Sequence, residues 1–217
     1  MKVFRVFSQF IVCVALLNLF AITNAQEIVI VDDFENGLSA TWSAKSFKDE
    51  TKYEVVTNEG RHVLQATSLG SASGLMFERE FDVYENSVLA WSWKIESTVE
   101  GGDYRQKTKD DFAARVYVTF PHWFFPKTTS LNYVWANQMV KEEIQPNAYT
   151  SNAMMIAVET GNQKAGRWLD VKRDIIADYR RAFGKEPPRK AVIAIMTDTD
   201  NTGETARAWY DNIYWIK

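Results

Sequence analysis

The sequence predicts a mainly β protein: one two-sheet antiparallel β-sandwich with a single amphipathic helix close to its C-terminal end. Two observations support this fold class. Many short segments alternate apolar and polar residues at period two, and Gly, Asn, Asp or Pro separate them. Residues 171–184 instead repeat apolar residues every four positions. No repeat or long linker divides residues 26–217, which we expect to form one domain.

The predicted strands are short and follow one another along the chain. Residues 27–34 are rich in β-branched side chains, and the turn formers Asn36 and Gly37 then end the run. The clearest alternation is in residues 87–95, which place Trp91 and Trp93 on one apolar face that we assign to the core. The other predicted strands are residues 53–57, 62–66, 75–83, 111–120, 131–136, 154–159, 191–197 and 205–216.

The predicted helix covers residues 171–184. Ile175, Tyr179 and Phe183 recur at a spacing of four and would form its buried stripe. Asp170 is the expected N-cap and Gly184 the expected C-cap, and the Pro-Pro pair that follows at 187–188 would prevent continuation.

Residues 1–25 have the three-part pattern of a secretory signal peptide. Lys2 and Arg5 precede the apolar run 10–22, and small residues at 23–25 predict cleavage before Gln26. The run is too short for a membrane span, so no transmembrane segment is expected after cleavage. We therefore expect an exported protein, periplasmic or secreted.

Composition excludes several classes of protein. The net charge of −3 becomes −5 once Lys2 and Arg5 are removed, which argues against nucleic acid as a partner because phosphate contacts need clustered Lys and Arg. The one cysteine, Cys13, also lies in the predicted signal segment. The remaining chain would have no disulfide, thiol nucleophile or cysteine metal ligand.

Residues 198–204, with Asp198 and Asp200, form the most distinctive polar motif. They match the first, third and glycine positions of an EF-hand calcium loop, but the fifth position is Thr202 and the twelfth is Trp209. The motif therefore predicts either a polar hairpin loop or a ligand or calcium loop of another type.

The chain ends carry a second acidic group. Asp32 and Glu35 follow the first strand, and Asp211 lies in the last. Terminal strands are often neighbours in a sandwich, so these oxygens are a candidate site for structural Ca²⁺. The alternative is that each carboxylate is solvated or caps a turn.

The strand over 111–120 has a polar side with Asp111, Arg115 and Tyr117, which indicates either a solvated face or a ligand groove. The run from Pro121 to Pro126 contains His122 and three aromatic residues beginning with Trp123. It predicts a loop folded onto the core, or else an exposed platform for a sugar ring or a membrane interface.

Four strings, 110–118, 131–136, 173–184 and 195–203, resemble a bacterial exported family catalogued as domain of unknown function 3047. The resemblance covers most of residues 26–217 and implies no catalytic residue. The segments 32–35 and 210–213 are also similar to the ends of jelly-roll carbohydrate-binding modules, which implies a jelly-roll-like sandwich and a structural calcium near the ends.

Three functions remain open at this stage. The first is noncatalytic binding of a glycan or another ligand in the cell envelope, with aromatic residues stacking on sugar rings. The second is hydrolysis of an envelope polysaccharide, for which the carboxylates of Asp111, Asp198 and Asp200 are the candidates. The third is a structural or partner-binding role through residues 123–125. The candidate ligand-binding residues are Asp111, Arg115, Tyr117, Trp123, Asn132, Trp135, Asp198 and Asp200.

Overall fold

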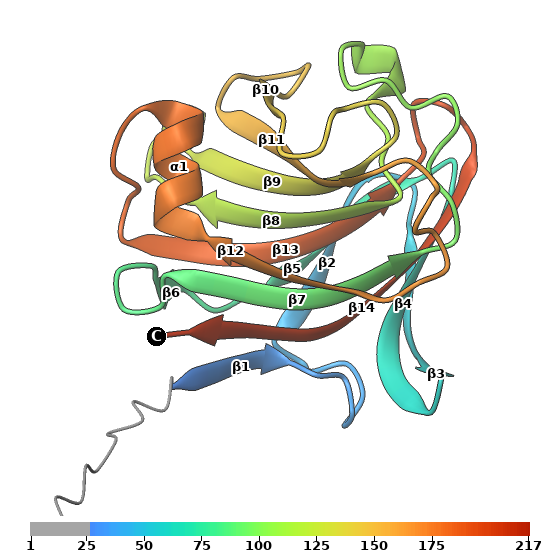
Figure 1. Ribbon diagram of the computed structural model, residues 1–217, viewed down its shortest axis with the longest axis horizontal. Coiled ribbons are helices and arrows are strands. Elements are labelled where there is room, and N and C mark those ends of the chain that lie inside the picture. Colours follow the sequence, from blue (N-terminus) through green and yellow to red (C-terminus); the bar gives the residue numbers. More distant parts are fainter. Residues whose placement is uncertain (1–26) are drawn as a thin grey trace, which may run out of the picture.

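The computed structural model describes residues 27–217 (Figure 1), so the predicted signal segment lies outside the described residues. The described chain forms two β-sheets packed face to face, together with one α-helix. This arrangement confirms the predicted sandwich.

The first sheet has six strands, in the order β12-β7-β14-β4-β3, with β1 added beside β14. Its neighbouring strands are antiparallel throughout. The strands are β1 (Ile28–Asp32), β3 (Lys52–Asn58), β4 (Arg61–Leu69), β7 (Val88–Ile95), β12 (Leu169–Asp174) and β14 (Thr205–Ile216).

The second sheet has eight strands, in the order β10-β11-β9-β8-β13-β5-β2, with the short β6 beside β13. All pairs are antiparallel except β9 and β11, which are parallel. The strands are β2 (Trp42–Lys48), β5 (Ala72–Phe77), β6 (Phe81–Asp82), β8 (Ala114–Phe120), β9 (Thr129–Ala136), β10 (Ile144–Pro146), β11 (Ala153–Thr160) and β13 (Lys190–Asp198).

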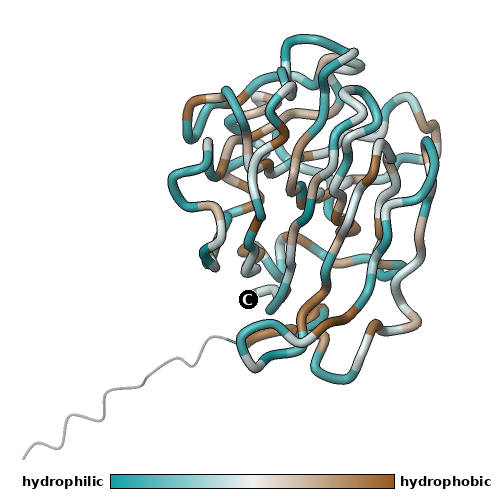
Figure 2. The backbone as a smooth tube through the Cα atoms, turned by 90° about the vertical axis from the view of Figure 1, so that its right-hand side faces the viewer, coloured by the Kyte–Doolittle hydropathy of each residue, from teal (hydrophilic) through white to brown (hydrophobic). Residues whose placement is uncertain are grey.

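Aromatic side chains join the two sheets across the core. Trp91 of β7 packs on Tyr133 of β9 with ring centroids 5.3 Å apart, and Trp93 packs on Trp135 at 5.8 Å. All four side chains are buried, as predicted for Trp91 and Trp93. Figure 2 shows hydrophilic and hydrophobic residues alternating along several strands, as expected when one face of a strand is buried and the other is polar.

The helix α1 (Ile175–Phe183) begins later than the sequence predicted. Asp174 is its N-cap and accepts a hydrogen bond from the amide of Ala177 at 2.9 Å, whereas Asp170 belongs to β12. Residues 169–174 alternate at period two and pair with β7, and this pairing takes them out of the helix. Gly184 is the C-cap, as predicted, in the left-handed conformation that glycine adopts without strain.

Several strand predictions need correction. The segment 75–83 is split into β5 and β6 by the exposed residues 78–80. The strands β2 and β10 were not predicted, because both lie at a sheet edge, where solvent on two sides leaves little apolar alternation. The parallel pairing of β9 with β11 departs from the all-antiparallel expectation, and no turn signal in the sequence encodes it.

Candidate ligand-binding face

One face of the eight-stranded sheet is turned away from the core. On β8, Val116 and Val118 belong to the core, so alternation places Tyr117 between them on the outer face. Strand pairing sets Tyr117 beside Ala194 of β13 on one side and Asn132 of β9 on the other. These residues form one row across the outer face.

A buried ion pair lies next to this row. Arg115 of β8 donates from Nε to Oδ1 of Asp198 at 2.7 Å, and a second guanidinium nitrogen donates to the other oxygen of Asp198. The guanidinium also donates to the backbone carbonyl of Asp110, whose carboxylate lies 3.7 Å away. All three side chains are buried. Arg115 and Asp198 therefore hold the end of β13 against the segment that leads into β8.

The polar motif at 198–204 joins the two sheets and is not a hairpin, because β13 lies in the eight-stranded sheet and β14 in the six-stranded sheet. Asp111 anchors this loop: its carboxylate accepts hydrogen bonds from the amide of Thr202 at 2.6 Å and from the side chain of Asn201 at 3.1 Å. Gly203 supplies the positive φ of 74° that the turn requires.

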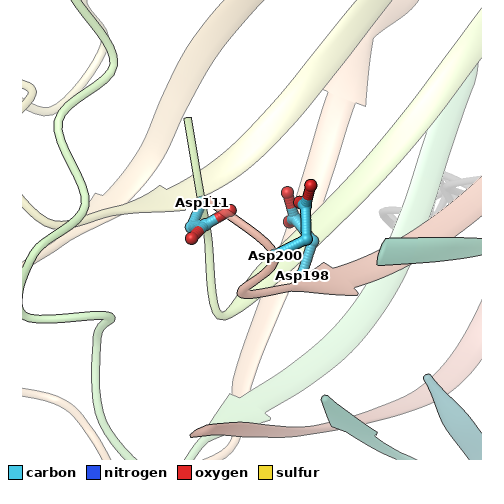
Figure 3. A group of neighbouring side chains, drawn as sticks. All are labelled: Asp111, Asp198 and Asp200. Atoms are coloured by element: carbon cyan, nitrogen blue, oxygen red, sulfur yellow. The ribbon is translucent and has the colours of Figure 1, made fainter. Parts of the chain in front are cut away.

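The carboxyl groups of Asp111, Asp198 and Asp200 converge (Figure 3), and one oxygen from each lies within 4.8 Å of the others. Asp111 comes from the segment before β8, whereas the other two come from the end of β13 and the following loop. Among the residues that the structure describes, this is the one group of three or more acidic, His or Cys side chains spaced to share an ion. The structure thus brings Asp111, Arg115, Asp198 and Asp200 together.

Burial and like charges raise two pKa values in this cluster. Desolvation raises the pKa of Asp198 to about 7, against the opposing effect of Arg115, and the charges of Asp111 and Asp110 act in the same direction as burial. Partial burial and the neighbouring Asp111 also raise the pKa of Asp200. The cluster therefore disfavours the addition of further negative charge.

The cluster is only partly suited to a cation. Both oxygens of Asp198 are engaged by Arg115, and those of Asp111 by residues 201 and 202. Asp200 is the least committed of the three acids: among the described residues, only the side chain of Asn201 donates to its carboxylate, at 3.1 Å. A divalent cation would bind through Asp111 and Asp200 and would compete with these hydrogen bonds.

Two exposed aromatic residues that the sequence reasoning missed flank this region. Phe47 of β2 is 63% exposed, and its ring lies over Gly74. A Cβ atom added to Gly74 would be 3.9 Å from the ring of Phe47. Tyr149 is 56% exposed, and its hydroxyl lies 2.6 Å from the carbonyl oxygen of Lys107 and 3.0 Å from Oδ1 of Asn201. The usual sequence signal for such a residue is a segment in which β-branched or aromatic residues alternate with polar ones. Neither Phe47 nor Tyr149 lies in a segment of this kind.

A lysine completes the polar end of the face. Lys48, the last residue of β2, donates from Nζ to the backbone carbonyl of Asp200 at 2.6 Å. Its ammonium group and the Asp200 carboxylate thus offer a hydrogen-bond donor and an acceptor close together. Tyr117 adds a hydroxyl to the outer face and donates to the weak acceptor Sδ of Met196 at 3.9 Å. Burial raises its pKa to about 12.

Two of the predicted ligand-binding residues are enclosed. Trp135 is completely buried in the core and donates from Nε1 to the carbonyl of Gly161 at 3.0 Å, so the expectation that it stacks on a ligand is wrong. Asn132 lies on the outer face but is 1% exposed, and its side-chain amide has no hydrogen-bond partner among the described residues. Alternation along β9 places Asn132 and Trp135 on opposite faces, and the register of this strand turns Trp135 inward.

Trp123 is far from the acidic cluster. It lies in the loop after β8, whereas Asp111 precedes that strand. The seven residues of β8 span about 23 Å at the usual rise per residue. Trp123 is 89% exposed, so the loop is not folded onto the core.

Among the described residues, the terminal acids Asp32, Glu35 and Asp211 are not spaced to share one metal ion. The strands β1 and β14 are neighbours, as expected, but Asp32 accepts hydrogen bonds from the amide of Phe34 and from Nε1 of Trp42, both at 2.8 Å. Glu35 instead contacts His62, and Asp211 accepts from Arg61 at 2.8 Å. Each carboxylate of the predicted calcium site therefore has its own protein partner.

Residues 27–217 include no helix with the length and apolar character needed to cross a bilayer.

Comparison with known proteins identifies a family but no function. The family model described as "Protein of unknown function (DUF3047)" matches residues 40–214, and no curated protein matches the chain. Similar solved structures include a mutant of the carbohydrate-binding module CBM29-2 complexed with cellulohexaose, with 9% identity and a TM-score of 0.42, covering 88% of this chain and 91% of that chain.

Two further structures are similar at the same level. The family 30 carbohydrate-binding module of a Clostridium thermocellum cellulosomal cellulase has 13% identity and a TM-score of 0.45, with 81% of this chain and 90% of that chain covered. A cellulase derived from Cel12A of Rhodothermus marinus has 10% identity and a TM-score of 0.46, with 89% and 100% covered.

Proposed function

Because the chain belongs to the DUF3047 family, which has no assigned activity, we propose from its own residues that it is a noncatalytic glycan-binding β-sandwich of the cell envelope. The glycan would lie on the outer face of the eight-stranded sheet, across Tyr117. Export to the periplasm or beyond is part of this proposal and rests on the pattern of residues 1–25.

One observation carries the proposal: exposed aromatic rings and a polar end share this face. Phe47 and Tyr149 expose ring surface, on which a sugar ring can stack through its apolar side. Lys48 and Asp200 offer a donor and an acceptor for sugar hydroxyls at the same end. Aromatic surface with a few fixed polar groups is the usual composition of a site for a neutral polar ligand.

Arg115 and Asp198 support this site from beneath and would not contact the sugar. Their bidentate pair holds the strand end from which residue 200 extends, and Asp111 holds the loop itself through Thr202. We therefore assign Asp200 to ligand binding, and Arg115, Asp198 and Asp111 to positioning.

The experiment is a binding screen followed by calorimetry. The purified protein is tested against soluble β-glucans, xylan, mannan and peptidoglycan fragments, with millimolar Ca²⁺ and with EDTA. For any sugar that binds, we expect F47A/Y149A to weaken affinity at least tenfold. The control is Y84A, which removes a tyrosine that is 41% exposed at a distant loop and should leave affinity unchanged.

The binding screen and the comparison of variants each have an outcome that supports the proposal and one that contradicts it. Binding that depends on Phe47 and Tyr149 supports the proposal, and a gain with Ca²⁺ would add a cation at Asp111 and Asp200. Failure of every probe in both conditions overturns the glycan proposal. Equal affinity of F47A/Y149A and the parent protein would show that the sugar binds elsewhere on the protein.

Hydrolysis of an envelope polysaccharide is a second candidate, favoured by the close carboxylates. The raised pKa of Asp200 suits a general acid, and Asp111 is near enough to assist it. In this case D200N would abolish release of reducing sugar from a polysaccharide that the parent protein degrades. Activity that survives both D200N and D111N would contradict the assignment.

A further inference from the structure

The loop between β8 and β9 carries the most conspicuous apolar surface of the described chain. Trp123, Phe124 and Phe125 are consecutive and are 89%, 47% and 78% exposed. The short 3₁₀ turn η2 (Phe125–Lys127) orders the loop, and the side chain of Asn152 donates to the carbonyl of Pro126 at 2.6 Å. Three adjacent exposed aromatic rings are unusual on a soluble surface and indicate a contact site.

The charges around this loop are as informative as its rings. Residues 121–128 contain no acidic side chain, and neither does the neighbouring turn 147–152. Lys127 directly follows the aromatic residues and makes no ion pair with another described residue. In a protein of net charge −3, these two segments are free of acidic side chains, and Lys127 is a cation that no described acid pairs with. An exposed group of aromatic rings beside a cation complements a partner that has an apolar interior and an anionic boundary with water.

The same geometry is poorly suited to a sugar. The rings of Trp123 and Phe124 are tilted by 43° with centroids 5.9 Å apart, so they do not form one flat platform. The loop offers no carboxylate or amide side chain to bind hydroxyl groups, and the hydroxyl of Thr128 already accepts from the amide of His122. A sugar site would need such fixed polar groups.

We propose that residues 122–127 insert into the surface of a phospholipid bilayer. Trp123 and Phe125 enter the boundary between headgroups and acyl chains, where aromatic side chains are favoured. Lys127 remains at the level of the lipid phosphates. Since this loop and the Asp200 end lie at opposite ends of β8, the bound protein would keep Lys48 and Asp200 accessible.

Lipid-dependent quenching of tryptophan fluorescence tests the proposal. Vesicles of phosphatidylcholine and phosphatidylglycerol contain brominated phosphatidylcholine, which quenches only tryptophans that reach the acyl region. Residues 1–26 contain no tryptophan, so the signal reports on the folded part of the chain. We expect quenching in the parent protein and loss of most of it in W123F.

Affinity is compared with Trp123 kept as the reporter. We expect F124A/F125A to need at least tenfold more lipid for half-maximal quenching, and K127E to lose more affinity for anionic than for neutral vesicles. F47A is the matched control, because it removes an exposed phenylalanine from the proposed glycan face and should bind vesicles normally. Glycan binding by F124A/F125A should be unchanged, which separates the two proposals.

Residues 10–22 form an apolar run that we expect to bind vesicles too, so each comparison is made with the full chain and with a chain that begins at Gln26. An effect of the loop substitutions in both forms supports the proposal. Absence of quenching in the parent protein, or equal affinity of F124A/F125A in either form, overturns it. Concentration-dependent dimerisation that F124A/F125A abolishes, without vesicle binding, would also overturn it and assign the loop to a second copy of the chain.

Discussion

Arg115 and Asp198 form a buried ion pair between neighbouring strands, with Nε and Oδ1 2.7 Å apart and both residues 2% exposed. The pair lies at the end of β13 from which the loop with Asp200 extends. Loss of one member would leave the other charge buried without compensation, and that is far more costly than the loss of an exposed pair.

We therefore expect R115M and D198N each to lower the free energy of unfolding by about 3–5 kcal/mol. Urea denaturation followed by circular dichroism measures the change. The double variant R115M/D198L removes both charges and should recover a large part of the loss. Single variants that unfold like the parent protein would show that the pair does not hold this strand end.

Asp211 predicts a pH dependence of stability in the mildly acidic range. Desolvation raises its pKa to about 6, and the charges of Glu35 and Asp33 act in the same direction. The folded state therefore retains a proton that the unfolded chain releases near pH 4, so stability from this group falls as the pH rises from about 4 to about 6.

Denaturant titrations of the parent protein and D211N across this range measure the effect. The difference in unfolding free energy between the two should shift in favour of D211N as the pH rises. A constant difference across the range would contradict a raised pKa at this position.

Two tryptophans on neighbouring elements should differ greatly in how much their substitution lowers stability. Trp135 is enclosed in the core and Trp123 is 89% exposed. We expect W135A to cost about 3–5 kcal/mol of stability because it leaves a large cavity. W123A should change stability by less than about 0.5 kcal/mol, as surface substitutions usually do. Thermal unfolding of both variants tests the inward register of β9.

The start of the helix gives a smaller test. D174A removes the cap that accepts from Ala177 and should cost about 1 kcal/mol. D170A is the matched control, because Asp170 is an exposed residue of β12 whose carboxylate accepts from Ser92. Its cost should be smaller than that of D174A. The reverse order would move the helix start back to the position that the sequence predicted.

The sequence was sufficient for the fold class and for most central strands. Alternation at period two identifies β7, β8, β13 and β14, because a strand buried on one face must repeat its apolar residues in this way. The same reasoning missed β2, since an edge strand has little need of such repetition. It also merged β12 with the helix. The spacing of Ile175 and Tyr179 continues backwards into residues 169–174, but these residues pair with β7.

The site was predictable in part. The sequence singled out Asp111, Asp198 and Asp200 as candidate carboxylates by residue type. It did not indicate that Arg115 would bind Asp198, because that contact joins residues 83 positions apart. Phe47 and Tyr149 were missed because exposure depends on what packs above a residue, and local sequence does not record it.

The sequence by itself determined that this chain forms a β-sandwich with an acidic balance, that its one cysteine leaves no pair for an internal disulfide, and that Trp91 and Trp93 lie on an inner strand face. The tertiary structure decided which acids meet, which aromatic residues remain exposed and which strands are parallel. The physical reason is the separation along the chain over which each interaction acts. Periodicity and turn chemistry act between near neighbours in the chain, whereas the meeting of Asp111 with Asp200 and the exposure of Trp123 depend on how distant strands are paired.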